Sequence, residues 1–165
     1  MDIDINDIKF KKRVSIEQIE ESKDICPKFD KVGLLPCITI ENETKMILMF
    51  SFINEEAFKK TILSKKGHYF SRSRNNVWKK GETSGMFHEI VNVYIDDDQD
   101  SVIYEVKLNS PKKGGKKASC HVGYKSCFYR KIKINKGEIK LEFIEQEKAF
   151  DPKIVYEGIP NPTKL

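Results

Sequence analysis

The chain has 165 residues, of which 39% are hydrophobic and 33% are charged, so it fits one domain with a real core better than two. Its 30 lysines and arginines against 25 aspartates and glutamates leave a net charge of +5, which suits a phosphorylated small molecule and is a thin excess for a polynucleotide. Because of this small excess, nucleic acid is not expected as a partner. A membrane is not expected either, because no apolar run approaches the roughly 18 residues of a membrane span.

The N-terminal stretch MDIDINDIKF lacks a basic segment followed by an apolar one, as a secretory signal would have. We therefore expect a cytoplasmic protein. In that compartment the four cysteines favour reduced thiols, either in the core or on a metal, over a disulfide framework.

The first predicted elements are a short helix and a hairpin. Ser15, with Gln18 three positions later, forms a capping-box pattern that predicts a helix over residues 15–22. Two apolar runs follow at 37–40 and 45–52, and the polar turn between them is typical of a β-hairpin.

The next helix begins after Asn54, a good N-cap residue, and should end near Lys66 and Gly67, where glycine tolerates a left-handed cap. One face of this helix is less polar and carries Ala57, Phe58, Thr61 and Ile62. Residues 68–85 are polar with interleaved aromatics, and they predict a loop with short strands.

Further along, residues 89–95 and 102–108 alternate apolar and polar side chains around an acidic turn, which predicts a second hairpin. The segment 110–119 is rich in lysine and glycine, so we expect a mobile loop there. Residues 128–134 and 139–144 predict two more strands, followed by a tail that lies along the surface.

These elements predict an α+β fold, specifically a small β-rich single domain. We expect an N-terminal extension with a short helix over residues 1–28, the main domain over 29–134, and a C-terminal strand and tail over 135–165 packed on that domain.

Cys120 and Cys127 flank a candidate metal site, with His121 between them. Thiolate and imidazole are the ligands that zinc prefers. The pattern alone leaves other interpretations open, since two cysteines at this spacing are often small buried apolar residues and a single histidine is often structural.

The acidic turn is a second candidate metal site. On an extended backbone the alternate residues Asp96, Asp98 and Asp100 would converge on one side, and carboxylates of this kind suit magnesium. Asp97 would then point the other way and serve a different centre. A solvated acidic turn without metal is the alternative.

Residues 71–84 offer groups that grip phosphate, namely guanidinium forks, ammonium groups and hydroxyls, together with aromatic rings that can stack on a base. The candidate substrate-binding residues are Arg72, Ser73, Arg74, Trp78, Lys80, Glu82, Thr83 and Ser84. Tyr69 is a second candidate for stacking. A charged surface loop with its aromatic residues in the core would give the same pattern.

Three segments read in order strongly resemble the phosphoribosyl-AMP cyclohydrolase family of histidine biosynthesis: HYFSRSRNNVWKKGETSG, DDDQD and SCHVGYKSCFYR. The segments FDKVGLLPCI and ILMFSFINEEAF resemble the family's opening strands and first helix, so the likeness covers residues 29–130. The resemblance implies an intertwined homodimer whose active sites lie at the subunit interface.

The resemblance also implies two metals. The magnesium-binding acids would be Asp96, Asp98 and Asp100. Zinc would be bound by Cys120 and Cys127, but the family's third cysteine is replaced here by Asp97. A carboxylate also ligates zinc, so Asp97 is expected to complete the site in a harder form.

The implied reaction is hydrolysis of the N1–C6 bond of the purine ring of phosphoribosyl-AMP, by zinc-activated water with magnesium. His121 is the candidate proton carrier, and the phosphoryl ends are assigned to Arg72, Arg74 and Lys80. Two alternatives stay open: a divergent paralogue that acts on another purine nucleotide or is catalytically silent, and a non-enzymatic zinc module that binds nucleic acid.

Overall fold

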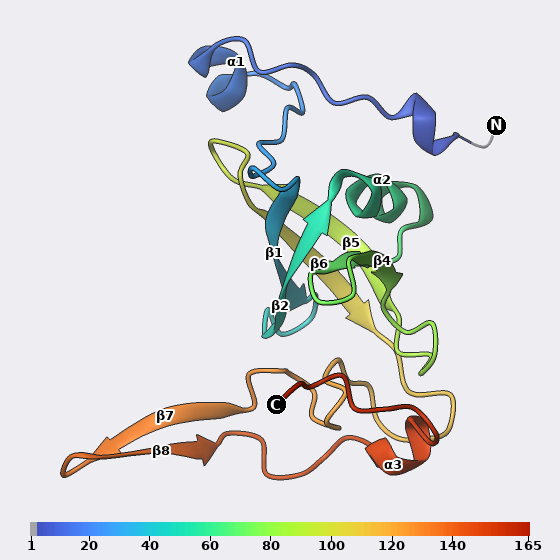
Figure 1. Cartoon of the computed structure of the whole chain (residues 1–165), viewed down its shortest axis with the longest axis vertical. Helices are drawn as coiled ribbons and strands as arrows, with labels where there is room; N and C mark the ends of the chain where they lie inside the picture. Colours follow the sequence, from blue (N-terminus) through green and yellow to red (C-terminus); the bar gives the residue numbers. More distant parts are fainter. Residues whose placement is uncertain (1–2) are drawn as a thin grey trace.

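The computed structural model describes residues 3–165 and shows an α+β fold built on one curled, mixed sheet (Figure 1). The sheet has six strands in the order β4-β3-β2-β1-β6-β5, and a separate pair is formed by β7 and β8. The elements in chain order are η1 (Ile5–Asp7), α1 (Ile16–Glu21), β1 (Leu34–Glu41), β2 (Ile47–Asn54), α2 (Glu55–Ser64), β3 (His68–Ser71), β4 (Asn76–Lys79), β5 (His88–Ile95), β6 (Val102–Leu108), β7 (Arg130–Asn135), β8 (Glu138–Phe143) and α3 (Pro152–Val155).

The predicted strands are confirmed, and their pairing explains the fold. β1 and β2 form the first hairpin, with Cys37 opposite Ser51, and β5 and β6 form the second. The two hairpins join through a parallel pairing of β1 with β6, in which Cys37 lies beside Val102. This non-local pairing has no signature in either strand alone.

Both predicted helices form, but one ends differently from the prediction. The Asn54 side chain accepts a hydrogen bond from the backbone of Ala57 at 2.9 Å and begins α2. The left-handed residue that ends α2 is Lys65 at φ 55°, not Gly67. Gly67 is needed for another reason: a Cβ there would lie 2.8 Å from the Tyr69 hydroxyl.

Residues 3–165 cover only one face of the six-stranded sheet. The covered face carries Leu35, Cys37 and Tyr104, which are fully buried in the main core with residues of α2. On the opposite face Ile38 and Phe50 pair across β1 and β2, and they are 36% and 50% exposed. A sheet with an uncovered apolar face is incomplete as a hydrophobic core.

The β7–β8 hairpin extends away from the rest of the chain as an arm (Figure 1). One of its faces carries apolar side chains from paired positions: Ile132, Ile134, Ile139, Leu141 and Phe143. These five side chains are 46–71% exposed. The alternate positions, among them Lys133 and Lys140, are polar. The expected division of the chain at residues 28 and 134 stays a prediction.

The N-terminal extension is attached to the acidic turn through Gln99. The Gln99 carboxamide accepts from the backbone N–H of Cys26 at 2.8 Å and donates to the carbonyls of Ile19 and Asp24. The predicted helix α1 therefore lies over the turn between β5 and β6.

The lysine-rich loop has exposed side chains but an anchored backbone. Lys112 donates its backbone N–H to Ser84 at 2.8 Å, and Lys116 donates to Ala149 at the same distance. The tail after Phe150 contains the short helix α3, which the sequence analysis missed. Asp151 caps this helix, and Val155 is buried against Met86, Ala118 and Phe150. Among residues 3–165, no helix is long and apolar enough to cross a membrane.

Candidate active site

A tight loop brings the two candidate zinc-binding cysteines together. The Cys120 backbone donates to the Tyr124 carbonyl at 3.1 Å, and Cys127 donates to Leu48 of β2 at 2.7 Å. Gly123, at φ 109°, makes the turn, and a Cβ there would press on the backbone oxygen of Phe150. As a result, the two thiols are hydrogen-bonded to each other, with Cys120 buried and Cys127 exposed.

The electrostatics of the loop favour a thiolate at Cys120. The hydrogen bond from Cys127, a backbone N–H at Val122 and the nearby Lys80 cation together lower the pKa of Cys120 to about 7. The same hydrogen bond and burial raise the pKa of Cys127. A soft metal ion binds cysteine as the thiolate, so a thiol that loses its proton near neutral pH is suited to metal binding.

Lys80 is fixed by the backbone beside the cysteines. It is 8% exposed and donates through its ammonium group to the Ser119 carbonyl. Burial lowers the pKa of Lys80, and the neighbouring cysteines oppose that shift. The predicted phosphate ligand is therefore committed in part to holding the cysteine loop.

A buried hydrogen-bonded chain supports this loop from the core, and the sequence analysis did not foresee it. Ser119 Oγ contacts Nε2 of His88 at 2.9 Å, and Nδ1 of His88 contacts the Tyr69 hydroxyl at 2.7 Å. The Tyr69 hydroxyl also lies 3.1 Å from Thr39 Oγ1. Burial and the Lys80 cation hold the pKa of His88 well below its usual range, so its ring is neutral.

The prediction that Tyr69 stacks on a base is wrong, because this ring is fully buried in the main core. Trp78 packs against Tyr69 with ring centroids 5.2 Å apart, and it also lines a pocket.

The pocket holds about 680 Å³ and gathers most of the predicted substrate-binding residues beside the cysteine loop. Those on its lining are Arg74, Trp78, Lys80, Glu82, Thr83 and Ser84, together with His121 and Cys127. Arg72 and Ser73 are not on the lining. The Arg72 guanidinium lies 4.2 Å from the centre of the Phe52 ring, and Ser73 lies in the exposed turn before β4.

His121 lies in this pocket with an unused nitrogen. Its Nε2 is buried and has no hydrogen-bond partner among the described residues. Burial and the Lys80 cation lower the pKa of His121, while the Asn161 carboxamide beside the ring opposes that shift.

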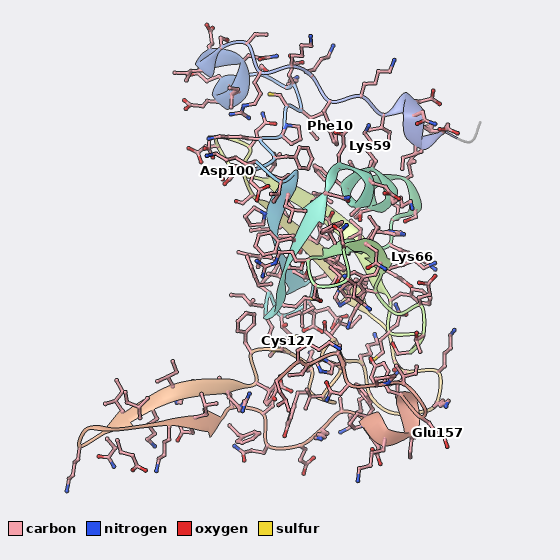
Figure 2. All side chains as sticks on the ribbon, viewed as in Figure 1. Phe10, Lys59, Lys66, Asp100, Cys127 and Glu157 are labelled. Atoms are coloured by element: carbon pink, nitrogen blue, oxygen red, sulfur yellow. The ribbon has the colours of Figure 1, made fainter. Side chains whose placement is uncertain are left out.

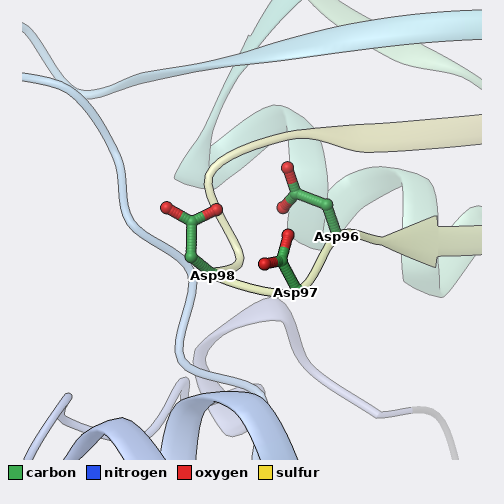
Figure 3. Close-up of side chains that lie close together, drawn as sticks. All are labelled: Asp96, Asp97 and Asp98. Carbon is green, nitrogen blue, oxygen red and sulfur yellow. The ribbon is translucent and has the colours of Figure 1, made fainter.

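The acidic turn does not direct Asp97 away from its neighbours, as the alternation along an extended backbone predicted. Oxygens of the consecutive residues Asp96, Asp97 and Asp98 lie within 4.8 Å of one another, because residues 97–100 form a turn with Gln99 at φ 57° (Figure 3). Asp96 is oriented by the backbone N–H groups of Asp100 and Ser101 at 2.9 and 3.1 Å. Burial raises the pKa of Asp96, but the hydrogen bonds from Ser101 and Asp100 outweigh it and lower the pKa below its usual value.

The two candidate metal sites lie far apart in one chain. Asp100 and Cys127 are at opposite ends of the six-stranded sheet (Figure 2). Among residues 3–165, the aspartates 96–98 are the only group of three or more potential metal ligands. The predicted zinc set of Asp97, Cys120 and Cys127 is therefore not assembled within a single chain.

Comparison with known proteins identifies the family. A profile described as phosphoribosyl-AMP cyclohydrolase matches residues 49–129. A phosphoribosyl-AMP cyclohydrolase of Bradyrhizobium diazoefficiens is 42% identical over 139 residues, which are 84% of this chain and 94% of the relative. The chain belongs to the phosphoribosyl-AMP cyclohydrolase family.

Other family members are similarly close. A phosphoribosyl-AMP cyclohydrolase of Rhodopseudomonas palustris strain HaA2 is 43% identical over 143 residues, covering 86% of this chain and 93% of the relative. One from Rhizobium etli strain CIAT 652 is 38% identical over 138 residues, covering 84% and 89%. The family profile includes every predicted site residue, whereas residues 152–162, which also line the pocket, lie beyond it.

Proposed function

We propose that this protein hydrolyses the N1–C6 bond of the purine ring of phosphoribosyl-AMP, the reaction of histidine biosynthesis for which its relatives are named. The observation that carries the proposal is the pocket of about 680 Å³, which is lined by Cys127 of the thiol pair, by His121 and by the glycine-bounded loop of residues 80–85. No observation favours a divergent substrate or a nucleic-acid-binding zinc module.

The loop of residues 80–85 is built to approach a phosphoryl group closely. Gly81 and Gly85 both have positive φ, at 87° and 83°, and a Cβ on Gly81 would overlap the backbone of Phe87. Between them, Thr83 and Ser84 present hydroxyl groups to the pocket. Arg74 adds a guanidinium fork at the same lining, and Trp78 offers a face for the base.

The chain's residues fit zinc in part. Cys120 and Cys127 supply two soft ligands already in contact, and we assign the third position to Asp97 of a second copy of the chain. Bound zinc lowers the pKa of a water molecule to about 7, which makes hydroxide available at neutral pH. Magnesium is assigned to the acidic turn, where Asp96, Asp98 and Asp100 supply hard oxygens.

His121 is proposed to carry the proton that the reaction needs. Water adds its oxygen to C6, the N1–C6 bond breaks, and C6 becomes the carbon of a carboxamide. The free nitrogen Nε2 of His121 takes a proton from the attacking water and returns it to N1 as that nitrogen leaves. A neutral ring is required for the first step, and burial favours the neutral form.

A homodimer accounts for two features of the single chain. It would bring the acidic turn of one copy to the cysteines of the other, which one chain keeps at opposite ends of the sheet. It would also cover the uncovered sheet face around Ile38 and Phe50 and the apolar face of the β7–β8 arm. A two-stranded hairpin alone is marginally stable in water, so the arm requires such a cover.

The direct test is turnover of phosphoribosyl-AMP by purified, chelator-stripped protein, followed by near-ultraviolet absorbance as zinc and magnesium are restored singly and together. We expect turnover that depends on zinc, with Cys120→Ser inactive but folded. If the folded protein shows no turnover with any metal, the proposal fails, and Asp97→Cys then tests whether the replaced ligand is the cause.

A further inference from the structure

The substrate pocket has an outer wall made by the C-terminal tail. Its inner wall comes from the strands and loops that the family profile matches, and the outer wall comes from residues 152–162. Tyr156, Ile159 and Asn161 are among the side chains on this outer wall. The tail therefore closes a pocket whose inner wall already holds the candidate catalytic residues.

The outer wall is attached to the core rather than lying loosely on it. α3 places Val155 in a small cluster with Met86 and Phe150, and Phe150 contacts the Tyr156 ring at a centroid distance of 6.2 Å. Ile159 donates its backbone N–H to the Tyr156 carbonyl at 3.0 Å. The chain is thus directed back across the pocket immediately after the helix.

Asn161 is held in place by its sequence neighbours. Pro160 and Pro162 on either side have fixed φ values, and the residue before a proline is restricted to extended conformations. The side-chain oxygen of Asn161 accepts the backbone N–H of Thr163 at 2.9 Å, which fixes the direction of the carboxamide. Its Nδ2 takes no part in that bond, so the two N–H groups of this preorganised side chain can donate to a ligand.

The position of Asn161 gives this donor a target. Its carboxamide lies beside His121, the candidate proton carrier, and both side chains line the same pocket. A base whose C6 is presented to His121 therefore has its N7 and 6-nitrogen edge within the same part of the pocket. The Nδ2 group of Asn161 can donate to N7 of adenine, while its Oδ1 faces the Thr163 N–H and the His121 ring.

We propose that Asn161 is a specificity-determining residue that reads the N7 acceptor of the purine, and that the Pro-Asn-Pro segment exists to hold it there. This inference rests on the proposed function in that it takes a purine nucleotide as the ligand. It adds a binding residue outside the part of the chain that the family profile matches.

The test is a cycle of two ligands and two proteins. Binding of AMP and of 7-deaza-AMP, which lacks the N7 acceptor, is measured by calorimetry for the wild-type chain and for Asn161→Ala. We expect the wild type to prefer AMP by about tenfold and the variant to bind both ligands equally, since a lost hydrogen bond to a site group is of this size. A loss of fold or of general pocket shape would weaken both ligands alike.

Two further variants sharpen the result. Asn161→Asp keeps the oxygen that accepts from Thr163 but loses the donor, so it should also lose the preference for AMP and raise KM for phosphoribosyl-AMP about tenfold. Lys164→Ala, in the same exposed tail but off the pocket lining, should match the wild type.

Three results would overturn the role of Asn161: equal binding of the two ligands by the wild type, no binding of either, or an unchanged preference in Asn161→Ala. If the wild type prefers AMP through Asn161 yet fails to turn over phosphoribosyl-AMP with any metal, the proposed function fails and the role of Asn161 stands.

Discussion

Two buried tyrosines provide a matched test of the hydrogen-bonded chain under the cysteine loop. Tyr69 and Tyr104 are both fully buried, and their ring centroids are 5.7 Å apart. The Tyr69 hydroxyl contacts His88 at 2.7 Å and Thr39 at 3.1 Å. Within residues 3–165 the Tyr104 hydroxyl has no hydrogen-bond partner. Thr61 is a nearby polar group, but its hydroxyl already bonds to the backbone of His68.

The two phenylalanine substitutions should therefore differ in sign. Tyr69→Phe leaves two buried polar groups unpaired, at about 1–3 kcal/mol each, so we expect a loss of about 2–5 kcal/mol in the free energy of unfolding. Tyr104→Phe removes a hydroxyl that was buried without a bond, so it should be neutral or stabilise the protein by about 1 kcal/mol.

The assay is urea unfolding at pH 7.5 and one fixed protein concentration, because the proposed dimer would make the apparent stability depend on concentration. Equal losses for the two variants would show that the bonded hydroxyl of Tyr69 contributes no more to stability than the hydroxyl of Tyr104. If Tyr69→Phe leaves the free energy of unfolding unchanged, the buried hydrogen-bonded chain is refuted. If Tyr69→Phe folds but binds zinc more weakly, the buried hydrogen bonds of Tyr69 and His88 support the cysteine loop.

Three further predictions follow from the geometry. The pKa of His88 is held well below its unfolded value of 6.5, so stability should be full above pH 6.5 and fall below it by up to about 1.4 kcal/mol per pH unit, and His88→Asn should reduce that slope in urea unfolding across pH. Gly81→Ala should cost about 1–3 kcal/mol more than Gly33→Ala by the same assay, because both have positive φ but only a Cβ on the first overlaps backbone. Ile134→Lys on the apolar face of the arm should weaken the proposed dimer in light scattering on dilution, and Lys140→Glu on the polar face should not; equal behaviour of the two would remove the arm from the interface.

The local elements were predictable because their signals are local. The cap at Asn54 and the one at Ser15 satisfy N–H groups within three residues, and alternating side chains mark each strand through the pattern of burial it requires. One local prediction failed, because the left-handed residue that ends α2 is Lys65 and not Gly67. Gly67 is required instead by its close contact with the Tyr69 hydroxyl, and the sequence pattern gives no sign of that contact.

The family and its site segments were also readable from sequence, because motif order is a one-dimensional property. What the tertiary structure decided is which of those residues share a space. The turn placed Asp97 beside Asp96 and Asp98 instead of on the opposite side, burial removed Tyr69 from the pocket, and the tail added Asn161 to it. Each of these outcomes depends on backbone direction or on contacts between segments far apart in the chain, and neither is encoded in the spacing of residues along it.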